Sequence, residues 1–101
     1  MGWATGHITH LKDGRTVRCR PRGHSMVGKI NSGQLCTIVP YDVGAEIKVG
    51  DIVLCRVNGR ELLHLVRSTR GEQYQIGNMR GHINGWITRA AIYGRCIHVE
   101  D

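Results

Sequence analysis

The chain has 101 residues, of which 41% are hydrophobic and 22% are charged. This length and composition are typical of one globular domain, so we expect residues 1–101 to form a single unit. No apolar run is long enough to span a membrane, and the first residues lack the basic and apolar regions of a signal peptide, which predicts a soluble cytoplasmic protein without a membrane partner. The formal net charge is +6 at pH 7.

The chain is predicted to be β throughout, because short alternating or apolar runs are separated by turn residues. In chain order, the predicted strands are residues 16–20, 34–39, 52–57, 61–67, 73–76 and 92–99. A further strand is expected before Asp13-Gly14, since this dipeptide is a strong hairpin signal between two strands. Six or seven short strands with tight turns predict an all-β fold, a compact coiled β-domain or partly open barrel.

Glycine, proline and asparagine mark the connections between these strands. In order, the connections are a turn or single helical turn at residues 25–32, a loop at 41–50, a hairpin at Asn58-Gly59, an irregular loop at 77–85 and one short helical turn at 86–90. The Asn58-Gly59 turn fixes the register of the strand that follows it. We therefore expect Leu62, His64 and Val66 to share one face of that strand.

Arginines cluster shortly before Ser25, at positions 15, 18, 20 and 22. One interpretation is a phosphate-binding surface for nucleic acid. The other is the solvent face of a strand that points Val17 and Cys19 inward, and the alternation favours it. Aromatic residues make up only 5% of the chain, so a stacking platform for single-stranded nucleic acid is not expected and nucleic acid is not the favoured partner.

The cysteines and histidines do not have the spacing of metal ligands. Cysteines occur at positions 19, 36, 55 and 96, with no C-x-x-C pair among them. We expect reduced thiols that pack as small apolar side chains, because nothing indicates export to an oxidising compartment. Histidines at positions 7, 10, 82 and 98 are scattered along the chain. No metal and no other cofactor is predicted.

Ser25 and His64 are the residues that could carry chemistry. Gly23 permits a sharp turn into Ser25, and His64 lies inside a predicted strand. A neutral imidazole within reach of a serine hydroxyl can take its proton and so activate it as a nucleophile. Backbone N–H groups of the turn, with support from Gly23 and His24, would stabilise the oxyanion. A core histidine satisfied by its neighbours is the other interpretation of His64.

Four segments in order resemble the signal peptidase and LexA-type serine peptidase superfamily. They are Gly23-His24-Ser25-Met26 with the following 32–38 strand, Val49-Gly50-Asp51-Ile52-Val53-Leu54, the 58–66 strand, and Tyr93-Gly94-Arg95-Cys96-Ile97. The resemblance covers about residues 15–99 and implies a stand-alone peptidase domain of phage or bacterial type. It implies that Ser25 is the nucleophile and that His64 is the general base, like the histidine of archaeal and endoplasmic-reticulum signal peptidases.

Three positions depart from this pattern. Gly28 lies where the family often has proline, Gly33-Gln34 replaces the first Gly-Asp, and Gly77-Asn78 replaces a Gly-Asp whose aspartate supports the site. We therefore expect Asn78 to orient His64 through its amide oxygen without supplying a charge.

The predicted function is a serine endopeptidase that hydrolyses a peptide bond in an extended protein segment. The alternative is a catalytically silent domain of the same fold that binds protein or nucleic acid through its arginine-rich strand. The sequence leaves the oligomeric state open.

Overall fold

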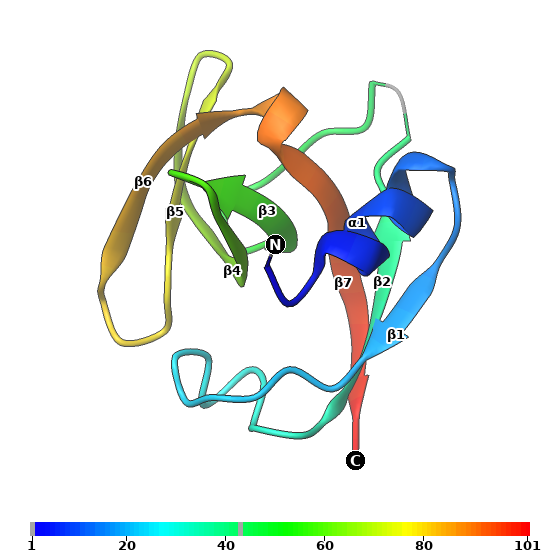
Figure 1. Ribbon diagram of the computed structural model, residues 1–101. Helices are drawn as coiled ribbons and strands as arrows, with labels where there is room; N and C mark the ends of the chain where they lie inside the picture. The colour runs from blue at the N-terminus through cyan, green and yellow to red at the C-terminus, as the bar shows by residue number, and fades with distance from the viewer. Residues whose placement is uncertain (1, 43) are drawn as a thin grey trace.

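In residues 2–42 and 44–101, which the computed structural model describes, seven antiparallel strands form one curved sheet (Figure 1). The strands are β1 (Val17–Cys19), β2 (Leu35–Pro40), β3 (Ile52–Val57), β4 (Arg60–Arg70), β5 (Gln73–Gly77), β6 (Ile83–Thr88) and β7 (Ile92–Glu100). Their order across the sheet is β1-β2-β7-β3-β4-β5-β6. The outer strands β1 and β6 do not pair with each other, so the sheet stays open, and the all-β fold prediction is confirmed.

An N-terminal helix, α1 (Thr5–Lys12), lies where the sequence predicts a strand, and that prediction is wrong. Ile8 and Leu11 are three positions apart and both are buried, which places them on the same face of a helix. Gly14 follows the helix with a φ of 80°, the left-handed conformation that commonly ends helices. Asp13-Gly14 therefore terminates a helix that packs over β2 and β7 (Figure 1).

The predicted strands at 16–20, 34–39, 52–57, 61–67, 73–76 and 92–99 are all confirmed, with ends shifted by a few residues. The predictions of an irregular loop to residue 85 and a helical turn at 86–90 are wrong, because β6 spans Ile83–Thr88 and a 3₁₀ turn follows at Arg89–Ala91. Trp86 pairs with Gln75 of β5. This ladder overrides the loop character of the local glycines and asparagines.

The Asn58-Gly59 hairpin sets the register of β4 as predicted. Both residues have positive φ, 50° and 79°, as a type I′ turn requires. Two apolar clusters result, and alternate residues of β4 enter different ones: Leu63 packs in the first cluster, whereas Leu62 and Val66 pack in the second. The alternation along β4 that places His64 is therefore confirmed.

Strand β1 and the cysteines also follow the sequence analysis. Val17 and Cys19 are buried, while Arg18 and Arg20 are exposed. All four cysteines are free thiols, and burial raises the pKa of Cys55 to about 12. In the described part of the chain, no helix combines the length and the hydropathy needed to cross a membrane.

Candidate active site

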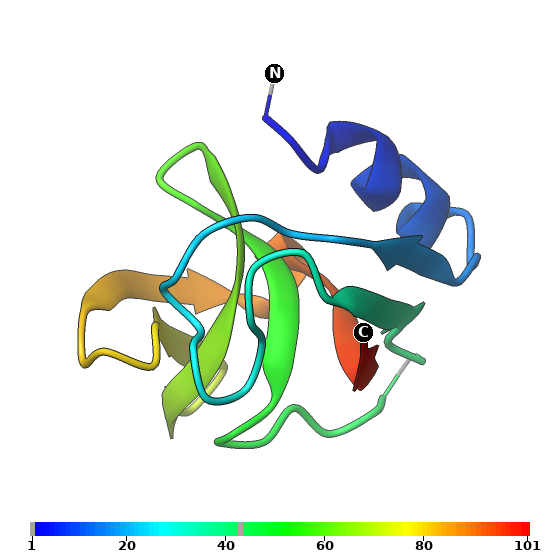
Figure 2. The same ribbon diagram turned by 90° about the horizontal axis from the view of Figure 1, so that it is seen from below.

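Ser25 lies on a short turn whose neighbouring side chains are anchored in the core. The turn belongs to the connection between β1 and β2, which crosses the sheet in front of the central strands (cyan in Figure 2). Met26 and Ile30 are only 5% and 4% exposed. The Ser25 carbonyl accepts a hydrogen bond from Met79 N–H at 2.9 Å. These contacts hold the backbone of the turn at Ser25 in place, which positions its side chain as nucleophilic attack requires.

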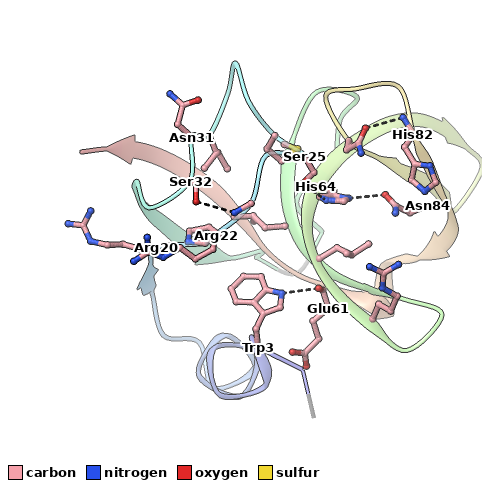
Figure 3. A pocket seen from close by; sticks show the side chains of 18 residues that line it. Trp3, Arg20, Arg22, Ser25, Asn31, Ser32, Glu61, His64, His82 and Asn84 are labelled. Carbon is pink, nitrogen blue, oxygen red and sulfur yellow. Dashed lines mark hydrogen bonds between the residues drawn. The ribbon is translucent and has the colours of Figure 1, made fainter.

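His64 reaches Ser25 from the middle of β4. The distance between Ser25 Oγ and His64 Nε2 is 3.1 Å (Figure 3), which is within hydrogen-bond reach for proton transfer. His64 is 8% exposed. It pairs across the ladder with Val53 of β3, which is 0% exposed, so the two side chains lie on the same face of the sheet. The serine and the histidine identified in the sequence therefore meet.

The second ring nitrogen of His64 has a partner that the sequence analysis missed. His64 Nδ1 lies 2.8 Å from Asn84 Oδ1 (Figure 3). Because an amide oxygen can only accept, Nδ1 carries the proton and donates it to this bond. Nε2 then keeps its lone pair and accepts the hydrogen bond from the Ser25 hydroxyl. Asn84 thus selects the tautomer of His64 that a general base needs.

A β-bulge directs Asn84 toward the site. In the β5–β6 ladder, Ile76 pairs with Gly85 and Gly77 pairs with Ile83, which leaves Asn84 as the extra residue. Bulges locally re-aim side chains and are frequent beside active sites. The glycine that follows Asn84 is a signal for such a bulge, but it can be interpreted only once the pairing of β6 with β5 is known.

The structure corrects the role predicted for Asn78. Its Oδ1 accepts hydrogen bonds from the N–H groups of Arg80 and His82, at 2.9 and 3.0 Å. Asparagine side chains commonly bond to backbone groups a few residues ahead in this way, which closes a tight loop. Asn78 therefore stabilises the connection between β5 and β6. The hydrogen bond to His64 that was expected from Asn78 is formed by Asn84 instead.

Gly23 and His24 precede Ser25 on the same turn. Gly23 has a φ of 121°, a conformation that favours glycine, and its N–H donates to Ser32 Oγ at 3.1 Å. His24 is exposed and lies outside the set of residues that line the cleft. Within the described residues, the N–H groups of Ser25 and Met26 have no protein acceptor. Both N–H groups therefore remain available to a developing oxyanion.

The surroundings of His64 keep its imidazole neutral. Burial lowers the pKa of His64 below its ordinary value, because the charged form loses its water. The hydrogen bond to Asn84 raises this pKa, and the electrostatic effects of Arg60 and His82 lower it again. The net shift of the His64 pKa is downward, which favours the neutral imidazole that can accept the proton of Ser25.

The Ser25–His64 pair opens into a cleft of about 710 Å³. The chain at residues 20–23 forms one wall, and the first half of β4 forms the other. Trp3 lies at the rim, where its Nε1–H donates to the Glu61 carbonyl at 2.9 Å (Figure 3). Sequence analysis missed Trp3, because its partner lies 58 positions away along the chain.

Within residues 2–42 and 44–101, one edge of β4 is unpaired beside His64. β3 covers one edge of the strand, whereas β5 joins the other edge only from Leu65 onward. Backbone groups of successive strand residues point to opposite edges. Since the Glu61 carbonyl reaches Trp3 on the open side, the N–H and C=O of Leu63 face the same way. The cleft thus contains backbone donors and acceptors that an extended chain could pair with.

In the parts of the chain that the structure describes, no carboxylate bonds to His64. Asp51 accepts hydrogen bonds from the Tyr41 hydroxyl at 3.2 Å and the Lys48 N–H at 3.0 Å, so it holds the 41–50 loop. The site is a serine, a histidine and an asparagine facing an open cleft. Comparison of the chain with models of known protein families and with curated protein sequences gave no match.

Proposed function

We propose that the protein is a serine endopeptidase that cleaves a peptide bond in an extended protein segment. The observation that carries this proposal is the contact between Ser25 Oγ and His64 Nε2 at 3.1 Å, with His64 Nδ1 held by Asn84 at 2.8 Å. Nucleophile, base and orienting group are the three parts of an activated serine. Ser25 and His64 also occupy the positions that the resemblance to signal peptidases and LexA-type peptidases gives to nucleophile and base.

The reaction proceeds in two proton-coupled steps. His64 Nε2 takes the hydroxyl proton while Ser25 Oγ bonds to the scissile carbonyl carbon, and the imidazolium then gives this proton to the leaving amine. Water enters the vacated position, loses a proton to His64, and attacks the acyl-serine ester. Ser25 Oγ leaves with that proton and the free carboxylic acid is released, so the enzyme returns to its starting state.

An uncharged asparagine at position 84, where a triad has a carboxylate, limits the rate of this reaction. Its amide oxygen orients His64 and accepts a hydrogen bond from the imidazolium, but it carries no negative charge to stabilise that cation. The N–H groups of Ser25 and Met26 supply the oxyanion donors, each expected to contribute about 3 kcal/mol to transition-state stabilisation. We therefore infer a slow enzyme whose catalysis depends mainly on positioning and on these donors.

The unpaired edge of β4 supports a peptide as the substrate. An extended chain added at this edge would exchange hydrogen bonds with the N–H and C=O of Leu63, one residue before His64. This placement would carry a peptide bond along the cleft past Ser25. A small-molecule ester would not use these backbone groups.

Labelling with a fluorophosphonate probe tests the proposal. The probe reacts with an activated serine, so we expect intact-mass spectrometry to show one adduct on the wild type, at Ser25. The adduct should be lost in Ser25→Ala and form much more slowly in His64→Ala. Ser68→Ala is the matched control, since this serine lies on the same strand as His64 without bonding to it, and its labelling should equal that of the wild type.

The competing interpretation is a silent domain that binds through its arginines. It predicts no adduct on folded wild-type protein at about pH 8, where an ordinary histidine is neutral. That result would overturn the peptidase proposal. Labelling that persists in Ser25→Ala would overturn it as well, because another nucleophile would then be responsible.

A further inference from the structure

The cleft described above is lined by three arginines, and no carboxylate in the described part of the chain forms an ion pair with them. Arg20, Arg22 and Arg60 line it and are exposed, and His82 lines it near Asn84. Figure 3 shows Arg20 and Arg22 on the side of the cleft away from His82 and Asn84. Arg60 belongs to the β4 wall and faces Arg20 and Arg22 on the opposite wall, so guanidinium groups lie on both walls and any ligand in the cleft lies between them.

Glu61 is the only acidic residue among those that line the cleft, and its charge is already compensated. Its side chain is 2% exposed and 2.8 Å from Arg56. It also accepts hydrogen bonds from Ala4 N–H and Thr5 Oγ1, both at 2.7 Å. Burial alone would raise the pKa of Glu61, but these hydrogen bonds hold it below the ordinary value. Glu61 is thus a structural anion and does not neutralise the cleft.

The three arginines keep their charge available to a ligand. Arg20 donates from NH1 to the Gly33 carbonyl at 2.9 Å, a neutral acceptor that positions the guanidinium without neutralising it. Within the described residues, none of the three forms an ion pair. Guanidinium groups offer several N–H donors in a planar fork that fits carboxylates and phosphates.

The backbone groups of the cleft distinguish between a peptide that carries carboxylates and a nucleic acid that carries phosphates. The N–H and C=O of Leu63 can form hydrogen bonds with a partner that has alternating main-chain donors and acceptors. A peptide has such groups and a nucleic acid lacks them. Single-stranded nucleic acid binds by stacking its bases on several aromatic side chains. Among the residues lining this cleft, Trp3 is the only aromatic one other than histidine. The combination fits an acidic peptide.

We propose that the cleft selects extended protein segments that carry aspartate or glutamate side chains on both sides of the bond facing Ser25. This inference rests on the proposed function for the position of that bond, but the charge preference is a property of binding alone. Carboxylates of the segment would contact Arg22 and Arg20 on one wall and Arg60 on the other. Each exposed pair contributes modestly, so several together are expected to give about a tenfold preference.

The test measures binding to Ser25→Ala, so that no turnover occurs. Two fluorescein-labelled peptides of equal length, alternating Ala–Asp and alternating Ala–Asn, are titrated at about 0.05 M and about 0.5 M salt. We expect the Asp peptide to bind about tenfold more tightly at low salt and the difference to shrink at high salt. Arg22→Gln and Arg60→Gln should each reduce the preference. Arg18→Gln removes the same charge outside the cleft and should retain it.

Equal affinity for the two peptides would overturn the inference, as would an equal loss of preference in Arg18→Gln, which would indicate attraction to net charge alone. Tighter binding of oligothymidylate that competes with the Asp peptide would also overturn it, because the cleft would then be a nucleic-acid surface. Fluorophosphonate labelling reports separately on the peptidase. Asp-selective binding without labelling would overturn the peptidase proposal and support the preference for acidic segments. Labelling without Asp-selective binding would support the peptidase proposal and overturn the preference for acidic segments.

Discussion

Replacing Asn84 with alanine tests the hydrogen bond that orients His64. A hydrogen bond between neutral groups contributes about 0.5–1.5 kcal/mol, and one to a charged group about 1.5–3 kcal/mol. The Asn84 bond is 2.8 Å long and changes from the first kind to the second as His64 takes the proton of Ser25. It should therefore strengthen by about 1–1.5 kcal/mol on the way to the transition state, and we expect Asn84→Ala to slow the labelling of Ser25 about tenfold.

The pH dependence separates this effect from a folding defect. The Asn84 bond raises the pKa of His64, so its removal lowers that pKa further. Labelling requires neutral His64, and the acid limb of the rate profile should therefore move to lower pH in Asn84→Ala. In Asn84→Asp, a carboxylate faces the same nitrogen and favours the charged imidazole. Its acid limb should move to higher pH, and its plateau rate should exceed that of the wild type.

The assay is the second-order rate constant for fluorophosphonate labelling between about pH 5 and about pH 9, a range that brackets histidine titration. Urea unfolding of each variant checks that the fold is retained. Identical plateau rates and identical acid limbs for wild type and Asn84→Ala would refute the reasoning, since the Nδ1 bond would then have no part in activating Ser25.

Three further predictions concern charge and packing. Arg60→Gln removes a charge that lowers the pKa of His64, so the acid limb of labelling should move to higher pH; an unchanged limb at low salt would contradict this. Glu61→Ala removes the carboxylate that accepts hydrogen bonds from Ala4, Thr5 and Arg56, and it should lower the free energy of unfolding by about 2–4 kcal/mol. Urea denaturation measures this change, and an unchanged midpoint would contradict the prediction. Gly94→Ala would place a methyl carbon 2.7 Å from the Val39 carbonyl oxygen and should lower the free energy of unfolding by about 1–3 kcal/mol. Gly6→Ala has open space around the added carbon in α1 and should leave this free energy unchanged or raise it. Equal urea midpoints for the two variants would contradict the packing argument.

The parts of the site that the sequence predicts are those with local signals. Gly23 marks the turn before Ser25, and Asn58-Gly59 fixes the register that places His64. Each signal depends on only a few neighbouring residues, because it reflects the backbone conformations that glycine and asparagine tolerate. Positions derived in this way agree with the structure.

The parts that the sequence does not predict depend on pairing between distant segments. Asn84 faces His64 only because the β5–β6 ladder contains a bulge, and Asn78 cannot be assigned without that ladder. The helix α1 was missed for a different reason, since Asp13-Gly14 is as suitable for ending a helix as for joining two strands. The helix is favoured over the hairpin because Ile8 and Leu11 are buried against the sheet. These are tertiary contacts, which the local sequence does not indicate.

The position of Trp3 gives the cleft an intrinsic optical reporter. The chain has two tryptophans. Trp3 is 50% exposed at the rim of the cleft, whereas Trp86 lies on β6, is 36% exposed and has the guanidinium of Arg70 4.5 Å from its ring centroid. With Trp86 replaced by phenylalanine, all indole emission would come from the rim. Its wavelength and quenching by iodide would then follow ligand entry directly, with no label attached to either molecule.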